Sequence, residues 1–261
     1  MKLKKIKNTL LVVLTLALVS VASVAITYAA VSADLGYKEN TFTNEDLAVE
    51  ISEQRWDGTP GTGETDESIA TKDLGSELAK SYSANMVIPK NPMLTNISDT
   101  SAAQGSDPQE WVAIKATYTV KVKVDSVETT YTYKTGTRFE QAIATLCTGT
   151  KESPTQGLGT GWTANTDKTV FYYNTAIANK VSTTRLFDFV KINNLQPEAS
   201  GTYQGKYKIL VTTDAGVDEE VYADELPEFH IKLEGYAVQY DGTNLNTAAK
   251  AKTPLDALMG V

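Results

Sequence analysis

Only a few side chains in this sequence have types and spacings that could support chemistry. His230 is the single histidine of the chain, and it stands between Phe229 and Ile231 in a stretch that alternates apolar and polar residues. Zinc hydrolases use two or three His or Cys ligands, commonly within H-E-x-x-H, and that motif does not occur in the sequence. We therefore interpret His230 as part of a solvated strand face, shared with Lys232 and Glu234, and predict no metal ligand.

Acidic residues gather in one turn, where Asp214, Asp218, Glu219 and Glu220 follow one another closely. Calcium prefers such oxygen ligands, but the loop of an EF-hand requires an alternating spacing that these residues lack. We predict that these acids are solvated, and we predict neither a cation site nor a cofactor.

The single cysteine, Cys147, belongs to a set of apolar residues with helical spacing that starts at Phe139. This position predicts a core cysteine rather than a reactive one. The sequence lacks G-x-S-x-G, and a Ser-His-Asp triad would depend on His230 alone. These observations predict a protein that is not an enzyme and has no catalytic residue.

Three aromatic residues, Trp162, Tyr172 and Tyr173, could form a platform for sugars. Aromatic residues in strands more often pack across neighbouring strands or in the core. We expect such packing here, and a surface module that binds carbohydrate or a host molecule is an alternative function.

The N-terminal region has the layout of a secretory signal. Four lysines precede an apolar run from Leu10 to Ile26, and small residues follow, including Ala29 and Ala30. We predict that a signal peptidase cuts after Ala29 or Ala30. Retention of the segment as a membrane anchor is the alternative.

The charge of the remaining chain limits its partners. Removal of residues 1–29 would take away four lysines and no acid, which leaves 20 basic against 32 acidic residues and a net charge of about −12. Such an acidic surface disfavours nucleic acid and anionic lipid. A single cysteine excludes an internal disulfide. We expect a secreted or cell-surface protein that meets the membrane only through its N-terminal segment before cleavage.

The pattern along the rest of the chain predicts a mainly β fold. The clearest strand covers 111–124, where apolar residues alternate with Lys and Thr, so one face should be buried and the other wet. Helices are expected over 137–147, with Thr137 as N-cap, and from Thr253-Pro254 onwards. Further strands are expected over 41–53, 168–174, 184–193, 206–212, 217–222 and 227–240, and loops over 57–67 and 151–161.

We therefore predict a single jelly-roll-type antiparallel β-sandwich with short helical insertions, preceded by an N-terminal signal or transmembrane helix. The predicted organisation is a signal segment over 1–29, an extended N-terminal segment over 30–43 and the β-sandwich domain over 44–261.

Several stretches, taken in order, are similar to those of a known family. They are NTFTNEDLAVEISEQRWD (Asn40–Asp57), IPKNPMLTNISDT (Ile88–Thr100), EWVAIKATYTV (Glu110–Val120), STTRLFDFVKIN (Ser182–Asn193) and FHIKLEGYAVQYDG (Phe229–Gly242). Together with the TYAAVSAD exit of the signal segment, their order and spacing resemble the TasA/camelysin family of Gram-positive exported proteins, which carry a SipW-type signal peptide.

The resemblance implies a secreted jelly-roll subunit of biofilm-matrix fibres, either the major subunit or an accessory. It implies assembly by donor-strand complementation, in which the freed N-terminal strand of one subunit enters the sheet of the next one. The donor strand would contain Val31, Ser32, Ala33, Leu35 and Tyr37. The implied partners are copies of the same chain in a head-to-tail homopolymer, or related fibre subunits. Some members of the family are classed as metallopeptidases, so a cell-surface metallopeptidase of camelysin type is an alternative.

Overall fold

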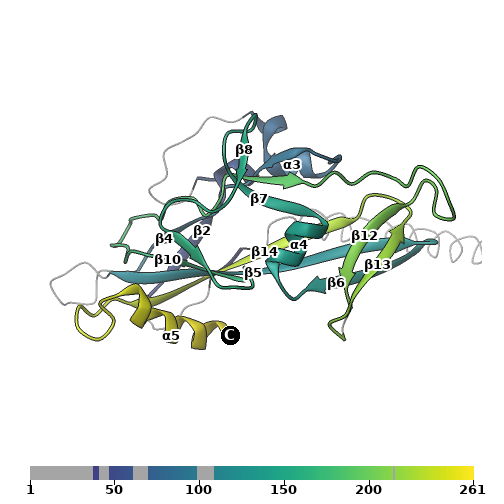
Figure 1. Ribbon diagram of the computed structural model, residues 1–261. Coiled ribbons are helices and arrows are strands. Elements are labelled where there is room, and N and C mark those ends of the chain that lie inside the picture. The colour runs from purple at the N-terminus through teal and green to yellow at the C-terminus, as the bar shows by residue number, and fades with distance from the viewer. Residues whose placement is uncertain (1–37, 41–46, 61–69, 99–108, 214) are drawn as a thin grey trace, which may run out of the picture. The chain divides into compact units, whose positions relative to one another are not determined.

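Strands dominate the part of the chain that the structure describes. The computed structural model describes residues 38–40, 47–60, 70–98, 109–213 and 215–261 of the 261-residue chain. The mainly β fold predicted from the alternating patterns is confirmed, because several mostly antiparallel sheets and a few short helices make up the described residues (Figure 1).

The largest sheet has six strands and is built around the fifteen-residue strand β5. Its path runs β1 (Lys38–Asn40), β14 (Glu228–Gln239), β5 (Glu110–Val124), β10 (Val170–Tyr173) and β9 (Trp162–Ala164), and β6 (Val127–Tyr133) also pairs with β5. One side of β5 is paired along β14, and the other side is shared by β10 and β6. Strand β6 pairs with the half of β5 that β10 does not reach.

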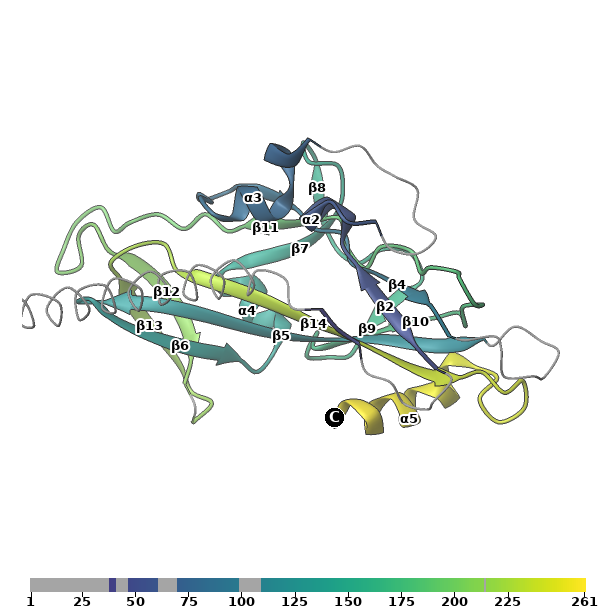
Figure 2. The same cartoon turned by 180° about the vertical axis from the view of Figure 1, so that it is seen from behind.

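Three smaller sheets surround this one (Figure 2). The four-stranded sheet has the order β3 (Val87–Pro89), β11 (Phe189–Ile192), β7 (Ala144–Gly149) and β8 (Pro154–Gln156). The two-stranded sheets are β12 (Tyr207–Thr212) with β13 (Asp218–Ala223), and β2 (Val49–Ser52) with β4 (Met93–Asn96). The strand pair expected over 206–222 is confirmed as β12 and β13.

The helices are short. They are α2 (Gln54–Asp57), the 3-10 helix η1 (Thr71–Asp73), α3 (Gly75–Ala79), α4 (Gly136–Ala142) and α5 (Ala248–Met259). Among the described residues, no helix is long and apolar enough to cross a membrane.

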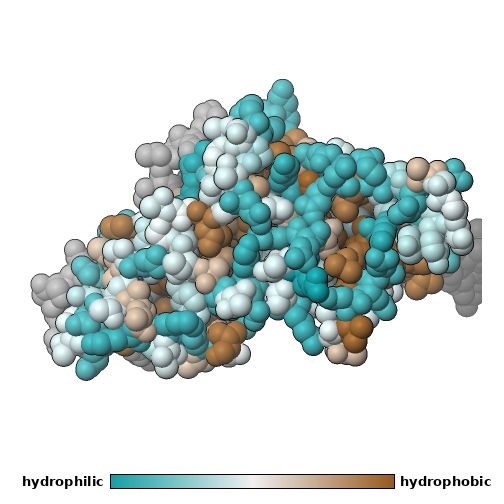
Figure 3. All heavy atoms as spheres, viewed as in Figure 1, coloured by the Kyte–Doolittle hydropathy of each residue, from teal (hydrophilic) through white to brown (hydrophobic). Residues whose placement is uncertain are grey.

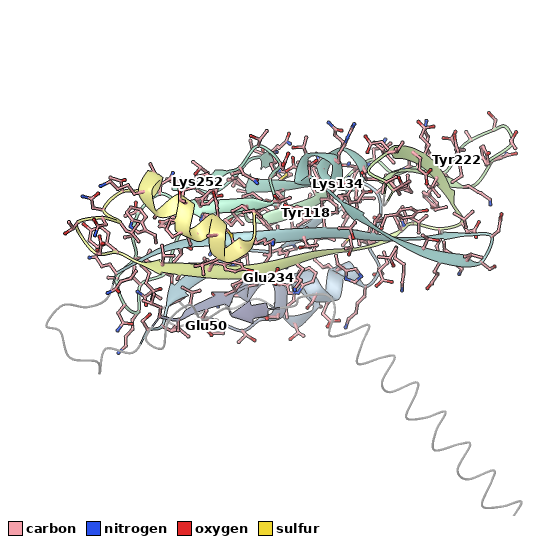
Figure 4. The ribbon with its side chains drawn as sticks, turned by 90° about the horizontal axis from the view of Figure 1, so that it is seen from below. Glu50, Tyr118, Lys134, Tyr222, Glu234 and Lys252 are labelled. Atoms are coloured by element: carbon pink, nitrogen blue, oxygen red, sulfur yellow. The ribbon has the colours of Figure 1, made fainter. Side chains whose placement is uncertain are left out.

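The alternation along β5 is confirmed, but the prediction of a wet second face is wrong for its first half. Residues on the predicted core face from Val112 to Val122 are buried. Trp111 and Ala113 on the opposite face are buried as well, because α5 packs over them. Lys115 on that face donates a hydrogen bond of 2.5 Å to the carbonyl of Met259, at the end of the helix. Figure 4 shows α5 and β2 on opposite sides of β14.

The helix predicted over 137–147 is too long. Its N-cap is Thr135 rather than Thr137, and the Thr135 hydroxyl accepts a hydrogen bond of 3.1 Å from the Arg138 N–H. Helix α4 ends at Ala142, and Cys147 lies in β7. Pairing of β7 with both β11 and β8 overrides the helical spacing of the apolar residues. Cys147 is nevertheless buried, as predicted.

The predicted loop over 151–161 and the predicted strand over 184–193 also differ from the structure. The loop region contains β8, which pairs with the second half of β7. Only the last part of the predicted strand, β11, forms a ladder. Apolar alternation alone therefore did not identify which segments find a partner strand.

Helix α5 begins earlier than Thr253. Thr247 is its N-cap, and Pro254 lies inside the helix rather than at its start. Ala251, Leu255 and Met259 form the docking face, with the four-residue spacing of one side of a helix. Leu258, by contrast, is 40% exposed.

Residues Lys38–Val261 form one compact unit. Three predicted features lie outside the described residues: the signal segment (1–29), the cut after Ala29 or Ala30, and the donor strand. The predicted donor-strand residues are Val31, Ser32, Ala33, Leu35 and Tyr37. Within the predicted extended segment 30–43, the structure describes Lys38–Asn40, which form β1.

Candidate functional site

The edge of β14 that faces away from β5 is the most distinctive site of the largest sheet. Toward β5, all twelve residues of β14 are paired. On the opposite edge, the described residues pair only through β1, in parallel and over three positions. The pairs are Lys38 with Leu233, Glu39 with Glu234 and Asn40 with Gly235. This is the one parallel pairing between strands of the described residues.

The register shows which main-chain groups of β14 face this outer edge. The turn between β5 and β6 has two residues with positive φ, Asp125 at 47° and Ser126 at 69°, which is typical of a type I′ hairpin. The pair that closes such a hairpin is hydrogen-bonded, so even-numbered residues of β5 face β6 and β10. The 2.8 Å bond from Ala116 N–H to the Thr169 carbonyl agrees with this alternation. Odd-numbered residues of β5 therefore face the even-numbered residues of β14.

It follows that odd-numbered residues of β14, such as Phe229 and Ile231, direct their N–H and C=O groups toward the edge where β1 lies. The Phe229 ring packs against Tyr82 at 5.4 Å and Phe139 at 5.7 Å between centroids. The Tyr82 hydroxyl donates to the carbonyl of Pro227, just before the strand. These contacts hold the first half of β14 in place.

The second half of β14 is positioned by close packing of the β2–β4 pair. A Cβ atom at Gly235 would lie 2.7 Å from a Leu94 methyl and 3.2 Å from Ile51. Both of these residues are buried. Glycine at position 235 therefore lets the β2–β4 pair approach β14 closely.

Ionisable side chains line one face of β14 at alternate positions, namely Glu228, His230, Lys232 and Glu234. His230 Nε2 lies 2.9 Å from a Glu228 carboxylate oxygen. The Lys232 ammonium lies 3.0 Å from Glu234, which is labelled in Figure 4. Burial lowers the pKa of Lys121 in the neighbouring strand, but the carboxylates of Glu228 and Glu128 outweigh it and raise that pKa. The His230 side chain is only 19% exposed and contacts Glu228, so the predicted face is less wet than expected.

Metal ligands do not converge in the described part of the chain. There, no three His, Cys, Asp or Glu side chains are grouped so that they could hold an ion. Asp218 lies 2.5 Å from Arg138 and accepts a hydrogen bond of 2.9 Å from Thr212. Glu220 pairs with Lys208 at 2.7 Å, and Asp214 lies outside the described residues.

The three aromatic residues do not form a common platform. Trp162 and Tyr173 are cross-strand partners with ring centroids 5.1 Å apart, and the indole N–H donates to the Thr184 carbonyl at 2.9 Å. The Tyr172 hydroxyl instead contacts α5, where it donates to Asp256 and accepts from Lys252 at 2.8 Å. The expected cross-strand packing is confirmed for Trp162 and Tyr173.

Two buried sites with ionisable side chains were not predicted from the sequence. Glu110 is fully buried, and its carboxylate accepts a hydrogen bond from the Ser98 hydroxyl. Burial raises the pKa of Glu110 to about 7, although hydrogen bonds from Ser98 and from the Ala48 backbone oppose the shift. The Lys90 ammonium lies 2.7 Å from Glu53, and both side chains are at most 4% exposed. No local pattern marks these residues, because each pair joins separate segments of the chain.

No family model, curated protein or solved structure matches this chain.

Proposed function

We propose that this protein is a secreted structural subunit, or an accessory, of extracellular matrix fibres, and that it polymerises by N-terminal donor-strand exchange after its signal segment is cleaved. The proposal includes a jelly-roll arrangement of the sheets and a structural rather than catalytic role. The observation that carries it is the pairing of β1, from the predicted N-terminal segment, with the outer edge of β14 over only three residues.

The register gives this pairing a direction. β1 runs parallel to β14, so the residues that precede Lys38 would continue along the first half of β14. There, the outward main-chain groups of Phe229 and Ile231 are the next available positions for a parallel strand. A segment that contains Leu35 and Tyr37 has the length to reach both.

Exchange between copies follows from the same contacts. If β1 and the residues before it leave their own β14 and pair with the β14 of a second copy, the same hydrogen bonds form between subunits. The net contribution of one hydrogen bond to stability is about 1 kcal/mol. A long donated strand is therefore bound more tightly than a strand that pairs over only three residues. Because the donor and acceptor lie on different parts of the subunit, the contact is head-to-tail and does not close.

Cleavage controls assembly in this scheme. Before the cut after Ala29 or Ala30, the N-terminal segment is tethered to the membrane by the apolar run that precedes it. After the cut, the segment from Val31 to Tyr37 is free to enter another subunit. The partners are further copies of the chain, or related fibre subunits, and the signal peptidase that makes the cut.

Cysteine cross-linking between two populations tests the exchange. Copies that carry Glu39→Cys are mixed with copies that carry Glu234→Cys, both starting at Ala30. Strands in a sheet lie about 4.8 Å apart, which is within the range of Cα separations that a disulfide can bridge. We expect disulfide-linked dimers of one copy of each kind, because Glu39 and Glu234 are paired in register.

The matched control replaces Glu234→Cys by Glu228→Cys. Position 228 is six residues away along the strand, or roughly 20 Å, and should not cross-link to position 39. A chain that carries both Glu39→Cys and Glu234→Cys and forms only internal disulfides at every concentration, with no dimer in the mixture, would contradict the proposed exchange.

A further inference from the structure

Strand β6 forms a second open margin of the largest sheet, on the opposite side of β5 from β14 (Figure 1). Among the described strands, β6 pairs with β5 alone. The residues from Val127 to Thr130 are exposed, and Tyr131 is half-buried. The first half of β6 is therefore accessible, whereas Tyr133 at its end is buried and donates a hydrogen bond to the Leu210 carbonyl of β12.

This margin lacks several of the features that commonly protect an edge strand. Edge strands are commonly guarded by proline, by a bulge or by an inward-pointing charge. The outer strands of the four-stranded sheet follow this rule, because β3 contains Pro89 and β8 contains Pro154. Strand β6 has no proline, its register with β5 is continuous from Val127 to Tyr133, and its sequence VETTYTY is rich in residues that favour strands.

The hairpin geometry shows which groups of β6 face outward. Since the closing pair of the β5–β6 hairpin, Val124 with Val127, is hydrogen-bonded, odd-numbered residues of β6 face β5. Even-numbered residues, Glu128, Thr130 and Thr132, direct their N–H and C=O groups to the free edge. A second strand can therefore bond to β6 only through these residues.

The sequence of β6 is complementary to itself in one antiparallel register. With a two-fold axis at Tyr131, Thr130 lies opposite Thr132 of the second copy, and Glu128 lies opposite Lys134, the exposed residue that directly follows β6 (Figure 4). The even-numbered residues then form the hydrogen-bonded pairs, as the outward groups require, and the two Tyr131 residues form a non-hydrogen-bonded pair. Opposite charges and Thr–Thr pairs directly across two strands stabilise such a sheet.

We propose that β6 is an interaction surface for a second copy of this chain, and that the two β6 strands pair antiparallel about a two-fold axis at Tyr131. The contact joins the largest sheets of two copies into one continuous sheet. Because the β14 edge lies on the other side of β5, the contact goes beyond the proposed donor-strand exchange and does not require it. A short edge contact is weak alone, but repetition along two fibres would hold them side by side.

The exposed first half of β6 is polar apart from Val127, which suits a strand-to-strand contact. On the face of the molecule shown in Figure 3, hydrophilic and intermediate residues predominate and apolar ones form separate groups. The Glu128 carboxylate contacts Lys121 at 3.6 Å, and both side chains are at least 36% exposed, so this ion pair is weak and easily exchanged.

A single cysteine tests the register. In Tyr131→Cys, the two introduced thiols face each other across the axis, at about 4.5 Å between Cα atoms in a non-hydrogen-bonded pair. The full chain is produced in a secreting bacterial host, collected from the medium and the cell surface, and oxidised in air. We expect disulfide-linked dimers on a non-reducing gel. The wild type is the control for Cys147, which is buried.

Thr129→Cys is the matched control on the same strand. Its thiols would be four residues apart across the axis, or roughly 13 Å, so no dimer should form. The proposal is overturned if Tyr131→Cys stays monomeric while its thiol reacts with a maleimide, or if Thr129→Cys dimerises equally well.

Charge reversal provides a test that needs no cysteine. Glu128→Lys and Lys134→Glu should each lower the dimer fraction in sedimentation several-fold, and the double variant should restore it. A double variant as weak as either single one would overturn the register. Deletion of residues 31–37 separates the two proposals: it should abolish donor-strand fibres and leave the Tyr131→Cys dimer unchanged.

Discussion

The Ser98 hydroxyl donates a hydrogen bond to the carboxylate of Glu110, which is fully buried at the start of β5. The same Ser98 oxygen accepts a hydrogen bond of 2.9 Å from the backbone N–H of Ala48. Through this small network, the segment that enters the domain from the N-terminal side is joined to the central strand of the largest sheet. A titratable group in this position makes the stability of the domain depend on pH.

Replacement of Glu110 by Gln should change that pH dependence. The pKa of Glu110 is raised from 4.5 to about 7, so the stabilising, protonated form is fully present below pH 4.5 and is lost as the pH rises to about 7. Between pH 4.5 and 8, the free energy of unfolding of Glu110→Gln should rise by on the order of 3 kcal/mol relative to that of the wild type. This figure follows from the raised pKa of Glu110, because one pKa unit corresponds to about 1.36 kcal/mol.

Urea denaturation of both proteins at several pH values measures this difference. The exposed Glu219→Gln serves as the control and should follow the wild type at each pH. Parallel curves for the wild type and Glu110→Gln would contradict a raised pKa of Glu110.

The buried ion pair of Glu53 and Lys90 predicts a large loss on single substitution. Lys90→Met would leave the Glu53 carboxylate buried without its partner and would remove the ammonium that lies 4.4 Å from the centre of the Trp56 ring. We expect a loss of about 3–5 kcal/mol in the free energy of unfolding, and partial recovery in Glu53→Gln/Lys90→Met.

Denaturant unfolding compares these variants with Lys80→Ala, which removes a helical ion pair that is 54% and 42% exposed at its two side chains. The control should lose less than about 1 kcal/mol. Equal losses at positions 80 and 90 would show that burial of the Glu53–Lys90 pair does not matter.

The docking face of α5 can be tested with two leucines of the same helix. Leu255 is 2% exposed and Leu258 is 40% exposed. Leu255→Ala should lower the free energy of unfolding by about 2–5 kcal/mol, because it leaves a cavity between α5 and β5. Leu258→Ala should have an effect within about 0.5 kcal/mol, since it removes few contacts. Thermal or urea unfolding measures the stability of both variants. Similar losses for the two substitutions would be inconsistent with this docking of α5.

Fibre formation should depend on the first residues after the predicted cut. A chain that starts at Ala30 should form filaments in electron microscopy, and deletion of residues 31–37 should abolish them without unfolding the domain, because the described sheets do not include those residues. Circular dichroism of the deleted chain checks that its β content is kept. A chain from Ala30 that stays monomeric at every concentration and pH would argue against the proposed function.

Local patterns in the sequence determined much of the strand content. The alternation along β5 and the strand pair of β12 and β13 were predicted because period-two patterning and turn residues act over short distances. The buried state of Cys147 was predicted too, although its helix was wrong. The resemblance of the sequence motifs and the signal-like N-terminus supplied the functional hypothesis.

Only the tertiary structure decided which segments of the chain pair or pack with one another. Helix α4 ends at Ala142 because the next residues pair with β11, a strand more than forty positions away. The second face of β5 is covered because α5 folds back over Trp111. The contacts of Glu110 with Ser98 and of Glu53 with Lys90, and the position of β1 on β14, likewise join distant segments. Such contacts depend on the full three-dimensional arrangement, and no local pattern of residues encodes them.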